Sequence, residues 1–355
     1  MDRPVNRPYL TTRSLTPENQ ESPVHFLNEY TTRVKYLFRR NHFSYPSYMK
    51  IPGSAHISGD VLQPLIFTFK DLLQMPLKEI NFTLECAGNG RSFFEPGVYG
   101  EQWKNGAVSH GRWRGVPLRI LLEYTGLKDS AQEIVFTGAD FGKKIGENSK
   151  LFARSLPLKK ALHEDTMIAC IYEGNPVPYK NGGPLRLIVP QWYGMASVKW
   201  LTNINVINRQ FHGPFQTEDY VYYPANEAEI SPFPVTTINI KSIIQKPQDY
   251  AILSLGPHYI QGLAWSGKGN IESVQVSTDK GKTWSEADLG RTSNIYAWVP
   301  WRYLWDTAEP GEYTIYSRAK DSEGRQQPMT PFWNKKGYGY NAAAKHHIKI
   351  ENKKA

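Results

Sequence analysis

The residues best suited to chemistry lie in one short stretch around the first of two cysteines. The stretch is ECAGNGR, residues 85–91, and it follows a run that is typical of a strand. A cysteine that leaves a strand into a glycine-rich loop exposes its sulfur beside backbone N–H groups, and Arg91 can favour its thiolate form. Such a sulfur is a nucleophile or a ligand for a soft or high-valent metal, although many cysteines beside glycine turns are simply buried and unreactive. A nucleophile would need a histidine base, and sequence proximity assigns none to Cys86.

The elements around Cys86 predict a domain that mixes strands and helices. Residues 64–84 predict a strand, a short helix that begins near Asp71, and a second strand that runs directly into Cys86. Further strands are expected at 133–137, 166–172 and 185–189, with a helix at 116–124. This alternation is typical of an α+β domain with the cysteine at a strand end.

The pattern changes past about Tyr222. The segment YYPANEAEISPFPV carries three prolines and no apolar periodicity, as an interdomain linker would. The remainder shows short alternating segments with turn signals between them, among them a good hairpin turn at 279–281, and predicts an antiparallel β-sandwich. We therefore predict a catalytic domain over 1–225, with an extended arm at 1–20, and a second domain over 226–355 that includes a linker at 226–235.

Composition limits the classes of function. A chain of 355 residues with 40% hydrophobic and 21% charged residues is expected to fold as two globular domains. The net charge of +9 favours anionic partners, but the basic residues are spread along the chain, which favours a small anion over nucleic acid. Two cysteines are too few for a disulfide scaffold or a zinc site made of cysteines.

The same sequence bears on location. No apolar run approaches the ~18 residues of a membrane span, and the first residues lack the apolar core of a secretory signal. We expect a cytoplasmic protein without a membrane span. A periplasmic or exported protein is the alternative if a leader was removed.

Several segments resemble the sulfite oxidase family, in the order in which that family has them. ECAGNGR resembles its molybdenum-binding cysteine loop, and FRRNHFSYP, at 38–46, resembles its substrate-arginine segment. The blocks at 103–126, 174–201 and 217–223 resemble its next conserved block, its pterin-binding block and its tyrosine segment. Residues 264–284 and 331–350 resemble its dimerisation domain. The resemblance spans about residue 20 to 350 and implies an α+β catalytic domain of sulfite oxidase type followed by an all-β immunoglobulin-like sandwich.

The resemblance also implies roles for individual residues. Cys86 would ligate molybdenum through its sulfur. Five residues would lie at or near the open face of the metal: Arg40, His42, Arg91, Trp103 and Tyr220. Guanidinium groups pair with oxyanions through planar forks of donors, and a neutral tyrosine donates one hydrogen bond, so these residue types suit an oxyanion substrate. Without the family blocks, surface ion pairs would be the ordinary role of the arginines.

A second set of residues is implied for the molybdopterin. Its members are Asn41, His42, Cys86, Asp140, Asn181, Arg186, Ser197 and Lys199. Arg186, Ser197 and Lys199 match the positions that hold the cofactor phosphate, and Asp140 resembles a carboxylate that contacts the pterin. Asn181 stands where animal members have a histidine, so that one contact is remade or lost. Arg291 is the nearest candidate for a further substrate arginine from the second domain, but the local match is too poor to assign it.

The implied reaction is the oxidation of sulfite to sulfate by oxygen-atom transfer at a Cys-ligated Mo-oxo centre. No haem or flavin motif is recognised, so electrons are expected to leave to an external acceptor, either oxygen or a separate redox protein. A homodimer is expected from the second domain. Two alternatives stay open: the same scaffold acting on nitrate, another sulfur compound or a sulfoxide, and a non-enzymatic binding protein that uses the sandwich domain.

Overall fold

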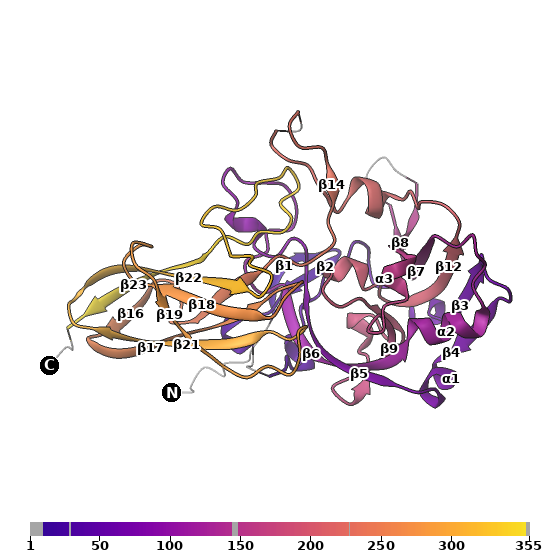
Figure 1. Ribbon diagram of the computed structural model, residues 1–355, viewed down its shortest axis with the longest axis horizontal. Coiled ribbons are helices and arrows are strands. Elements are labelled where there is room, and N and C mark those ends of the chain that lie inside the picture. Colours follow the sequence, from indigo (N-terminus) through magenta and orange to yellow (C-terminus); the bar gives the residue numbers. More distant parts are fainter. Residues whose placement is uncertain (1–9, 28–29, 144–147, 227, 353–355) are drawn as a thin grey trace.

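The computed structural model describes residues 10–27, 30–143, 148–226 and 228–352. The chain forms two parts that lie end to end along its longest axis (Figure 1). We call the part that ends with strand β13 (Val221–Tyr222) the first domain, and the part from strand β14 (Phe233–Pro234) onward the second domain. The predicted boundary at 225/226 lies between these two strands, which pair with each other; its exact position stays a prediction.

Two sheets build the first domain. One contains β5 (Lys78–Glu85), β6 (Val108–Pro117), β9 (Met167–Tyr172), β10 (Asn175–Pro176) and β11 (Arg186–Ile188). The other contains β3 (Ser54–Gly59), β4 (Leu65–Thr68), β7 (Glu133–Gly142), β8 (Lys150–Pro157) and β12 (Leu201–Ile207). Their strand orders are β10-β9-β6-β5, with β11 on β9, and β4-β3-β12-β7-β8. The pairing of β12 with β3 is parallel and the other pairings are antiparallel.

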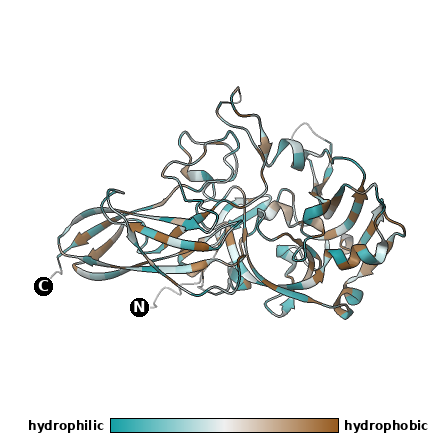
Figure 2. Cartoon of the chain, viewed as in Figure 1, coloured by the Kyte–Doolittle hydropathy of each residue, from teal (hydrophilic) through white to brown (hydrophobic). Residues whose placement is uncertain are grey.

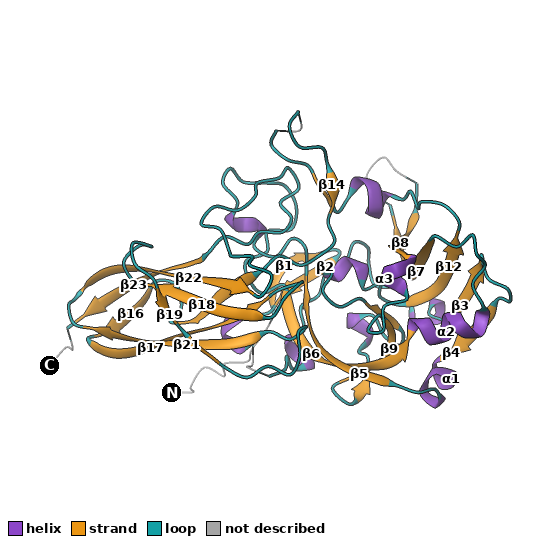
Figure 3. Ribbon diagram, in the orientation of Figure 1, coloured by secondary structure: helices purple, strands orange, loops and turns teal. Residues whose placement is uncertain are grey.

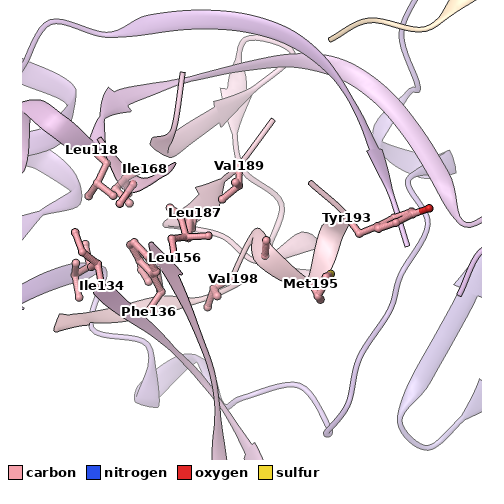
Figure 4. Close-up of a cluster of buried hydrophobic side chains, with 14 of the residues drawn as sticks. Leu118, Ile134, Phe136, Leu156, Ile168, Leu187, Val189, Tyr193, Met195 and Val198 are labelled. Carbon is pink, nitrogen blue, oxygen red and sulfur yellow. The ribbon is translucent and has the colours of Figure 1, made fainter. Parts of the chain in front are cut away.

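Apolar side chains from both sheets meet in the core of the first domain (Figure 4). Ile134 and Phe136 are two residues apart on β7 and therefore share one face of the strand. They lie with Leu156 of β8, Ile168 of β9 and Leu187 of β11, and all five are almost completely buried. This core fixes the relative position of strand ends that carry the candidate site.

The helices of the first domain are short (Figure 3): α1 (Phe69–Gln74), α2 (Leu118–Thr125) and α3 (Leu158–Ala161). The helix predicted to begin near Asp71 begins at Phe69, because Thr68 caps it: the Thr68 hydroxyl accepts from the Asp71 N–H, and the Asp71 carboxylate accepts from the Thr68 N–H. The strands and helix predicted at 133–137, 166–172, 185–189 and 116–124 correspond to β7, β9, β11 and α2. The prediction of an α+β domain is confirmed only in part, since this domain is mostly β.

The arm predicted as extended is folded back on itself in its described part. Strands β1 (Thr11–Leu15) and β2 (Glu18–Glu21) pair antiparallel as a hairpin. The Glu18 carboxylate holds it against the first domain, accepting hydrogen bonds from Arg39 at 2.7 Å and from the Tyr45 hydroxyl at 2.9 Å. Residues 1–9 of the predicted arm lie outside the described residues.

The second domain consists of two sheets, as the predicted β-sandwich requires, but it is not wholly antiparallel, because β16 (Ala251–Ser254) pairs in parallel with β23 (Ala344–Glu351). Its strands are β15 (Lys241–Lys246), β16 (Ala251–Ser254), β17 (Gly256–Trp265), β18 (Ile271–Ser277), β19 (Ser285–Glu286), β20 (Asp288–Leu289), β21 (Val299–Thr307), β22 (Gly311–Asp321) and β23 (Ala344–Glu351). They form a sheet of order β15-β17-β21-β20 and a sheet of order β16-β23-β22-β18-β19. Apolar and polar segments alternate along them (Figure 2), and buried apolar residues from both sheets pack together in one cluster. That the sandwich is immunoglobulin-like stays a prediction.

The predicted hairpin turn at 279–281 lies between β18 and β19. Lys280 and Gly281 both adopt positive φ there, and the Asp279 carboxylate accepts from the Thr283 N–H. In the described part of the chain, no helix combines the length and apolar character that crossing a bilayer requires.

Candidate active site

The Cys86 loop begins where β5 ends. The Cys86 N–H donates to the carbonyl of Ala107 at 2.9 Å, and the Cys86 carbonyl accepts from the Asn89 N–H at 2.9 Å, which closes a tight turn. The Asn89 side chain ties the turn down, because its oxygen accepts from the Ala107 N–H at 3.1 Å. Gly90 has a φ of 90°, which a residue with a Cβ rarely adopts. The sequence thus folds into a rigid loop that presents the Cys86 sulfur.

Cys86 lies on the wall of two adjoining cavities. The inner cavity, between the sheets of the first domain, has a volume of about 760 Å³ including its mouth. The outer cavity, of about 1600 Å³ including open solvent, lies between the first domain and a loop of the second. Four predicted site residues line both: Arg40, His42, Cys86 and Tyr220. A sulfur at this junction can reach a group held in one cavity and a reactant that enters through the other.

The remaining predicted residues separate between the two cavities. The inner one is lined by the predicted cofactor residues Asp140, Asn181, Arg186, Ser197 and Lys199. The outer one is lined by Asn41 and Arg91. The structure therefore gathers five of the predicted pterin-binding residues on one side of Cys86 and places Arg91 on the other, where Asn41, also predicted to bind the cofactor, lies as well.

Trp103 is the one predicted site residue that lines neither cavity. Its side chain is 0% exposed and packs in a core cluster with Cys86, Phe38 and Leu84. A large apolar ring gains more by filling this core than by facing an anion, so Trp103 supports the Cys86 loop from behind. Arg291 is exposed, lies between β20 and β21, and lines neither cavity.

Two buried cations, Arg186 and Lys199, line the inner cavity, and one donor of Arg186 has no hydrogen-bond partner among the described residues. The guanidinium of Arg186 donates to the Asn181 carbonyl at 2.7 Å, its Nε has no partner, and burial lowers its pKa to about 9. Lys199 donates to the carbonyl of Arg40 at 2.9 Å and to the side-chain oxygen of Asn41. Burial also lowers the pKa of Lys199. Buried donors with no protein partner are expected to face a bound anion.

Asp140 supplies the opposite chemistry in the same cavity. Burial raises the pKa of its carboxyl, and the nearby Lys199 ammonium opposes that effect. One of its oxygens has no hydrogen-bond partner among the residues that the structure describes. A carboxyl with a spare acceptor suits the N–H groups of a heterocycle such as a pterin. The donors and acceptors of the inner cavity thus fit a molecule that has both a phosphate and a heterocycle.

The thiol of Cys86 is controlled by two opposing effects. Burial raises its pKa, and the positive charges of Arg40 and, to a smaller extent, Arg91 lower it. The expectation that Arg91 favours the thiolate has the right sign, but burial outweighs it. Metal coordination would hold this sulfur deprotonated, since a coordinating thiol loses its proton outright.

Arg91 is held in a slot at the edge of the outer cavity. Its Nε donates to the carbonyl of Lys336 at 3.0 Å, and its Nη1 donates to the carbonyl of Glu101 at 3.1 Å. Its guanidinium carbon lies 5.1 Å from the centre of the Tyr338 ring. A Cβ on Gly337, whose φ is 60°, would lie 3.0 Å from the Cγ of Arg91. The slot therefore needs glycine, and it fixes the orientation of the guanidinium.

Tyr220 has a strained backbone and a fixed hydroxyl. Its φ is 57°, and its hydroxyl oxygen lies 2.9 Å from Nε2 of His42. The His42 ring packs on Phe152, with 4.9 Å between the ring centres. Burial raises the pKa of Tyr220, so its hydroxyl stays protonated and available as a donor. Strain of this kind is found at functional sites, where the surrounding structure over-determines it.

The second domain contributes residues that the sequence reasoning missed. Lys335, Lys336 and Tyr338, on the loop 332–340, line the outer cavity. The ammonium of Lys336 donates to the Asp219 carboxylate at 2.9 Å. The run WNKKG within the family block at 331–350 was a usable signal, but it was assigned only to dimerisation. Of the neighbours Tyr222 and Tyr223, which could have confused the register of Tyr220, only Tyr223 lines the outer cavity.

Comparisons with known proteins agree with this geometry. Residues 54–215 match the model of the oxidoreductase molybdopterin-binding domain, and residues 233–353 match that of the Mo-co oxidoreductase dimerisation domain. Mitochondrial sulfite oxidase of Mus musculus is 33% identical over 98% of this chain and 67% of its own length. Sulfite oxidase of Arabidopsis thaliana is 30% identical over 94% of this chain and 92% of its own length.

A solved structure extends the similarity to the whole fold. The sulfane dehydrogenase SoxCD of Paracoccus pantotrophus superposes with a TM-score of 0.84 at 28% identity, over 98% of this chain and 90% of that one. The predicted family is confirmed. This chain belongs to the sulfite oxidase family of molybdopterin-dependent oxidoreductases.

Proposed function

We propose that this enzyme oxidises sulfite to sulfate at a molybdenum held by molybdopterin and by Cys86. The observation that carries the proposal is the position of the Cys86 sulfur, at the junction of the inner and outer cavities. The kinship with sulfite oxidases of mouse and Arabidopsis supports sulfite as the substrate.

The inner cavity would hold the cofactor. Arg186, Ser197 and Lys199 would bind its phosphate, and Asp140 would accept from the pterin ring. Asn181 presents an amide where a histidine is familiar, and its N–H₂ group is 3.4 Å from the carbonyl of Phe38. When bound, the cofactor supplies the oxygen atom, takes up two electrons and passes them to an external acceptor.

The residues of the outer cavity would bind and orient sulfite. Arg40 and Arg91 offer fixed positive charge for its oxygens, and the Tyr220 hydroxyl offers a neutral donor. Nε2 of His42 lies 2.9 Å from that hydroxyl and can fix its orientation toward the anion. Because Arg91 is already oriented by two backbone carbonyls, little reorganisation is needed when the anion binds.

The second domain, of immunoglobulin-like topology in this proposal, would form a homodimer. The dimerisation-domain match over 233–353 supports this assembly. The electron acceptor would be a separate redox protein or oxygen. Sedimentation velocity over a hundredfold dilution should give a two-chain species, and a monomer at every concentration would contradict the assembly.

A second substrate class is favoured by one observation, the size of the outer cavity. The space in it that water-sized molecules can occupy is about 780 Å³, much larger than a sulfite ion, and the superposed relative is a sulfane dehydrogenase. A longer sulfur compound that carries an anionic end would also fit in the outer cavity, whose wall includes both Arg91 and the loop 332–340.

The experiment measures molybdenum content and the reduction of ferricyanide by purified protein. About one molybdenum per chain and sulfite-dependent reduction would support sulfite oxidation. Thiosulfate with ferricyanide, and nitrate and a sulfoxide each with a reduced dye, serve as parallel substrates. Metal-loaded protein that turns over one of these and not sulfite would redirect the proposal to that substrate, and a protein that binds no molybdenum in a replete host would end it.

A further inference from the structure

Arg154 is a buried arginine beside the candidate active site. It lies on β8, its side chain is 2% exposed, and it lines neither the inner nor the outer cavity. Its Nη1 donates to the backbone carbonyl of Phe215, and its Nε has no hydrogen-bond partner. Its guanidinium carbon lies 5.5 Å from the centre of the Tyr220 ring.

This guanidinium carries a charge that the protein does not neutralise locally. Among the described residues, no carboxylate lies within ion-pair distance of Arg154, whereas Arg39 pairs with Glu18 and Arg13 pairs with Glu21. Burial lowers the pKa of Arg154 to about 10, so the side chain stays positive at neutral pH. A buried and unpaired charge is costly, and proteins retain such groups chiefly where function uses them.

The position of Arg154 connects it to the anion site. Phe152 and Arg154 are two residues apart on β8, so their side chains leave the same face of the strand. Phe152 lines the inner cavity and packs on His42, and Phe215 packs on His42 from another side with 4.8 Å between ring centres. Arg154 therefore lies directly behind the wall formed by Tyr220 and these apolar rings.

We propose that Arg154 is a specificity-determining residue whose buried charge, behind Tyr220, favours doubly charged over singly charged anions in the outer cavity. The inference rests on the proposed function, which makes this cavity the binding site of an oxyanion. Apolar rings between a charge and an anion screen their attraction poorly, and that attraction is proportional to the charge of the anion. Loss of the charge should therefore reduce the binding free energy of a dianion by twice as much as that of a monoanion.

A structural role makes a different forecast. Arg154 also satisfies the Phe215 carbonyl in the π-helical turn Pro214–Glu218 and packs under the strained Tyr220. If that were its whole contribution, a neutral substitution would misplace Tyr220 and weaken every anion by a similar factor. The ratio between the two effects separates charge from support.

The test compares Arg154→Met with Arg154→Lys, which keeps the charge, in the molybdenum-loaded enzyme. Lys159→Met is the matched control, because it removes one exposed positive charge from the helix that follows β8. Competitive inhibition constants for sulfate and for chloride are measured at constant ionic strength. A second readout, independent of turnover, is the rise in unfolding temperature that each anion gives. Should Arg154→Met fail to fold, Arg154→Gln keeps a donor for the Phe215 carbonyl without the charge.

If Arg154 acts through its charge, Arg154→Met should raise the inhibition constant of sulfate roughly tenfold and that of chloride roughly threefold. Arg154→Lys and Lys159→Met should stay near the parent enzyme. Equal factors for both anions, or no change for either, would overturn the inference while leaving sulfite oxidation intact. A parent enzyme that bound neither sulfate nor sulfite would instead remove the proposed function, and with it this inference.

Discussion

The ammonium of Lys241 lies 3.5 Å from the carboxylate of Glu85, and the two residues belong to different domains. Lys241 begins β15 of the second domain, and Glu85 ends β5 immediately before Cys86. Lys241 also donates to the carbonyl of Asn89 at 3.2 Å, and the other Glu85 oxygen accepts from the Trp265 indole at 2.9 Å. The second domain thus holds the Cys86 loop directly, in addition to lining the outer cavity.

Removal of one member of this pair should be costly. Both side chains are almost completely buried, so Lys241→Met leaves the Glu85 carboxylate without its charge partner, and we expect a loss of about 3–5 kcal/mol in the free energy of unfolding. Lys320→Met, which breaks an exposed pair with Glu272 in the same domain, should cost less than about 1 kcal/mol. Urea unfolding of both variants measures the difference, and similar losses would show that the buried pair has no special weight.

The two cysteines form a matched pair of substitutions. Cys86→Ser should abolish sulfite turnover and remove sulfur-to-metal charge-transfer absorption. Cys170 is buried in the core, where burial raises its pKa to about 12, and it lines neither cavity. Cys170→Ser should therefore lower stability by about 1–3 kcal/mol and leave turnover per bound molybdenum unchanged. Retained turnover in Cys86→Ser would remove sulfur ligation from the account.

Arg91 offers a test of both charge and orientation. Arg91→Gln should raise the KM for sulfite. It should also lower kcat/KM by a factor that corresponds to a loss of about 2–3 kcal/mol in transition-state stabilisation, because a desolvated charge pair is lost. Gly337→Ala keeps the charge, but its Cβ would lie 2.3 Å from Val98 and 3.0 Å from Arg91, so it should disturb the slot and raise KM. Arg112→Gln, at an exposed position in the same domain, is the control for net charge. An unchanged KM in Arg91→Gln would exclude its substrate role.

Site residues that depend on local interactions could be predicted from the sequence, whereas those that depend on long-range packing could not. The Cys86 loop and the cofactor residues near 181–199 lie in continuous motifs, where spacing and local turns decide the geometry, and the structure gathers them as expected. That Trp103 packs in the core beside Cys86 and lines neither cavity could not be read from the sequence, because burial of a side chain depends on the packing of distant strands. Arg154 carried no motif, since its role comes from lying behind Tyr220, which is 66 residues away in sequence.

The range of the interactions also explains which features of the fold the sequence did not predict. The hairpin at 11–21 is held in place by the hydrogen bonds of Glu18 with Arg39 and Tyr45. No local pattern in the first twenty residues predicts these contacts. The loop 332–340 reached the outer cavity through the packing of two domains, and adjacent lysines alone do not reveal that. Period-two alternation, by contrast, is local, and the strands of the sandwich followed it.

His110 should make stability depend on pH. Its ring is buried on β6, Nδ1 donates to the Tyr30 carbonyl at 2.5 Å, and Nε2 has no partner. Burial lowers its pKa to about 4, against 6.5 for the exposed group, while the bond to Tyr30 partly offsets this effect. Above pH 6.5 the ring is neutral in both the folded and the unfolded chain, so it imposes no penalty there.

Between pH 6.5 and 4 the unfolded chain binds a proton at His110 that the folded chain excludes. Acidification through this window should therefore cost up to about 3 kcal/mol of stability, and below pH 4 the cost should stop growing. Urea unfolding across this range, with His110→Gln as the variant and His212→Gln as the exposed control, isolates the effect, because the carboxylates titrate equally in all three proteins. In His110→Gln the free energy of unfolding should fall less steeply with decreasing pH than in the parent, and near pH 5 the difference in slope should correspond to nearly one bound proton. His212→Gln should keep the slope of the parent. Identical slopes in the parent and His110→Gln would mean that the imidazole is protonated without cost in the folded state. That result would contradict the penalty expected for a buried Nε2 that has no hydrogen-bond partner among the described residues.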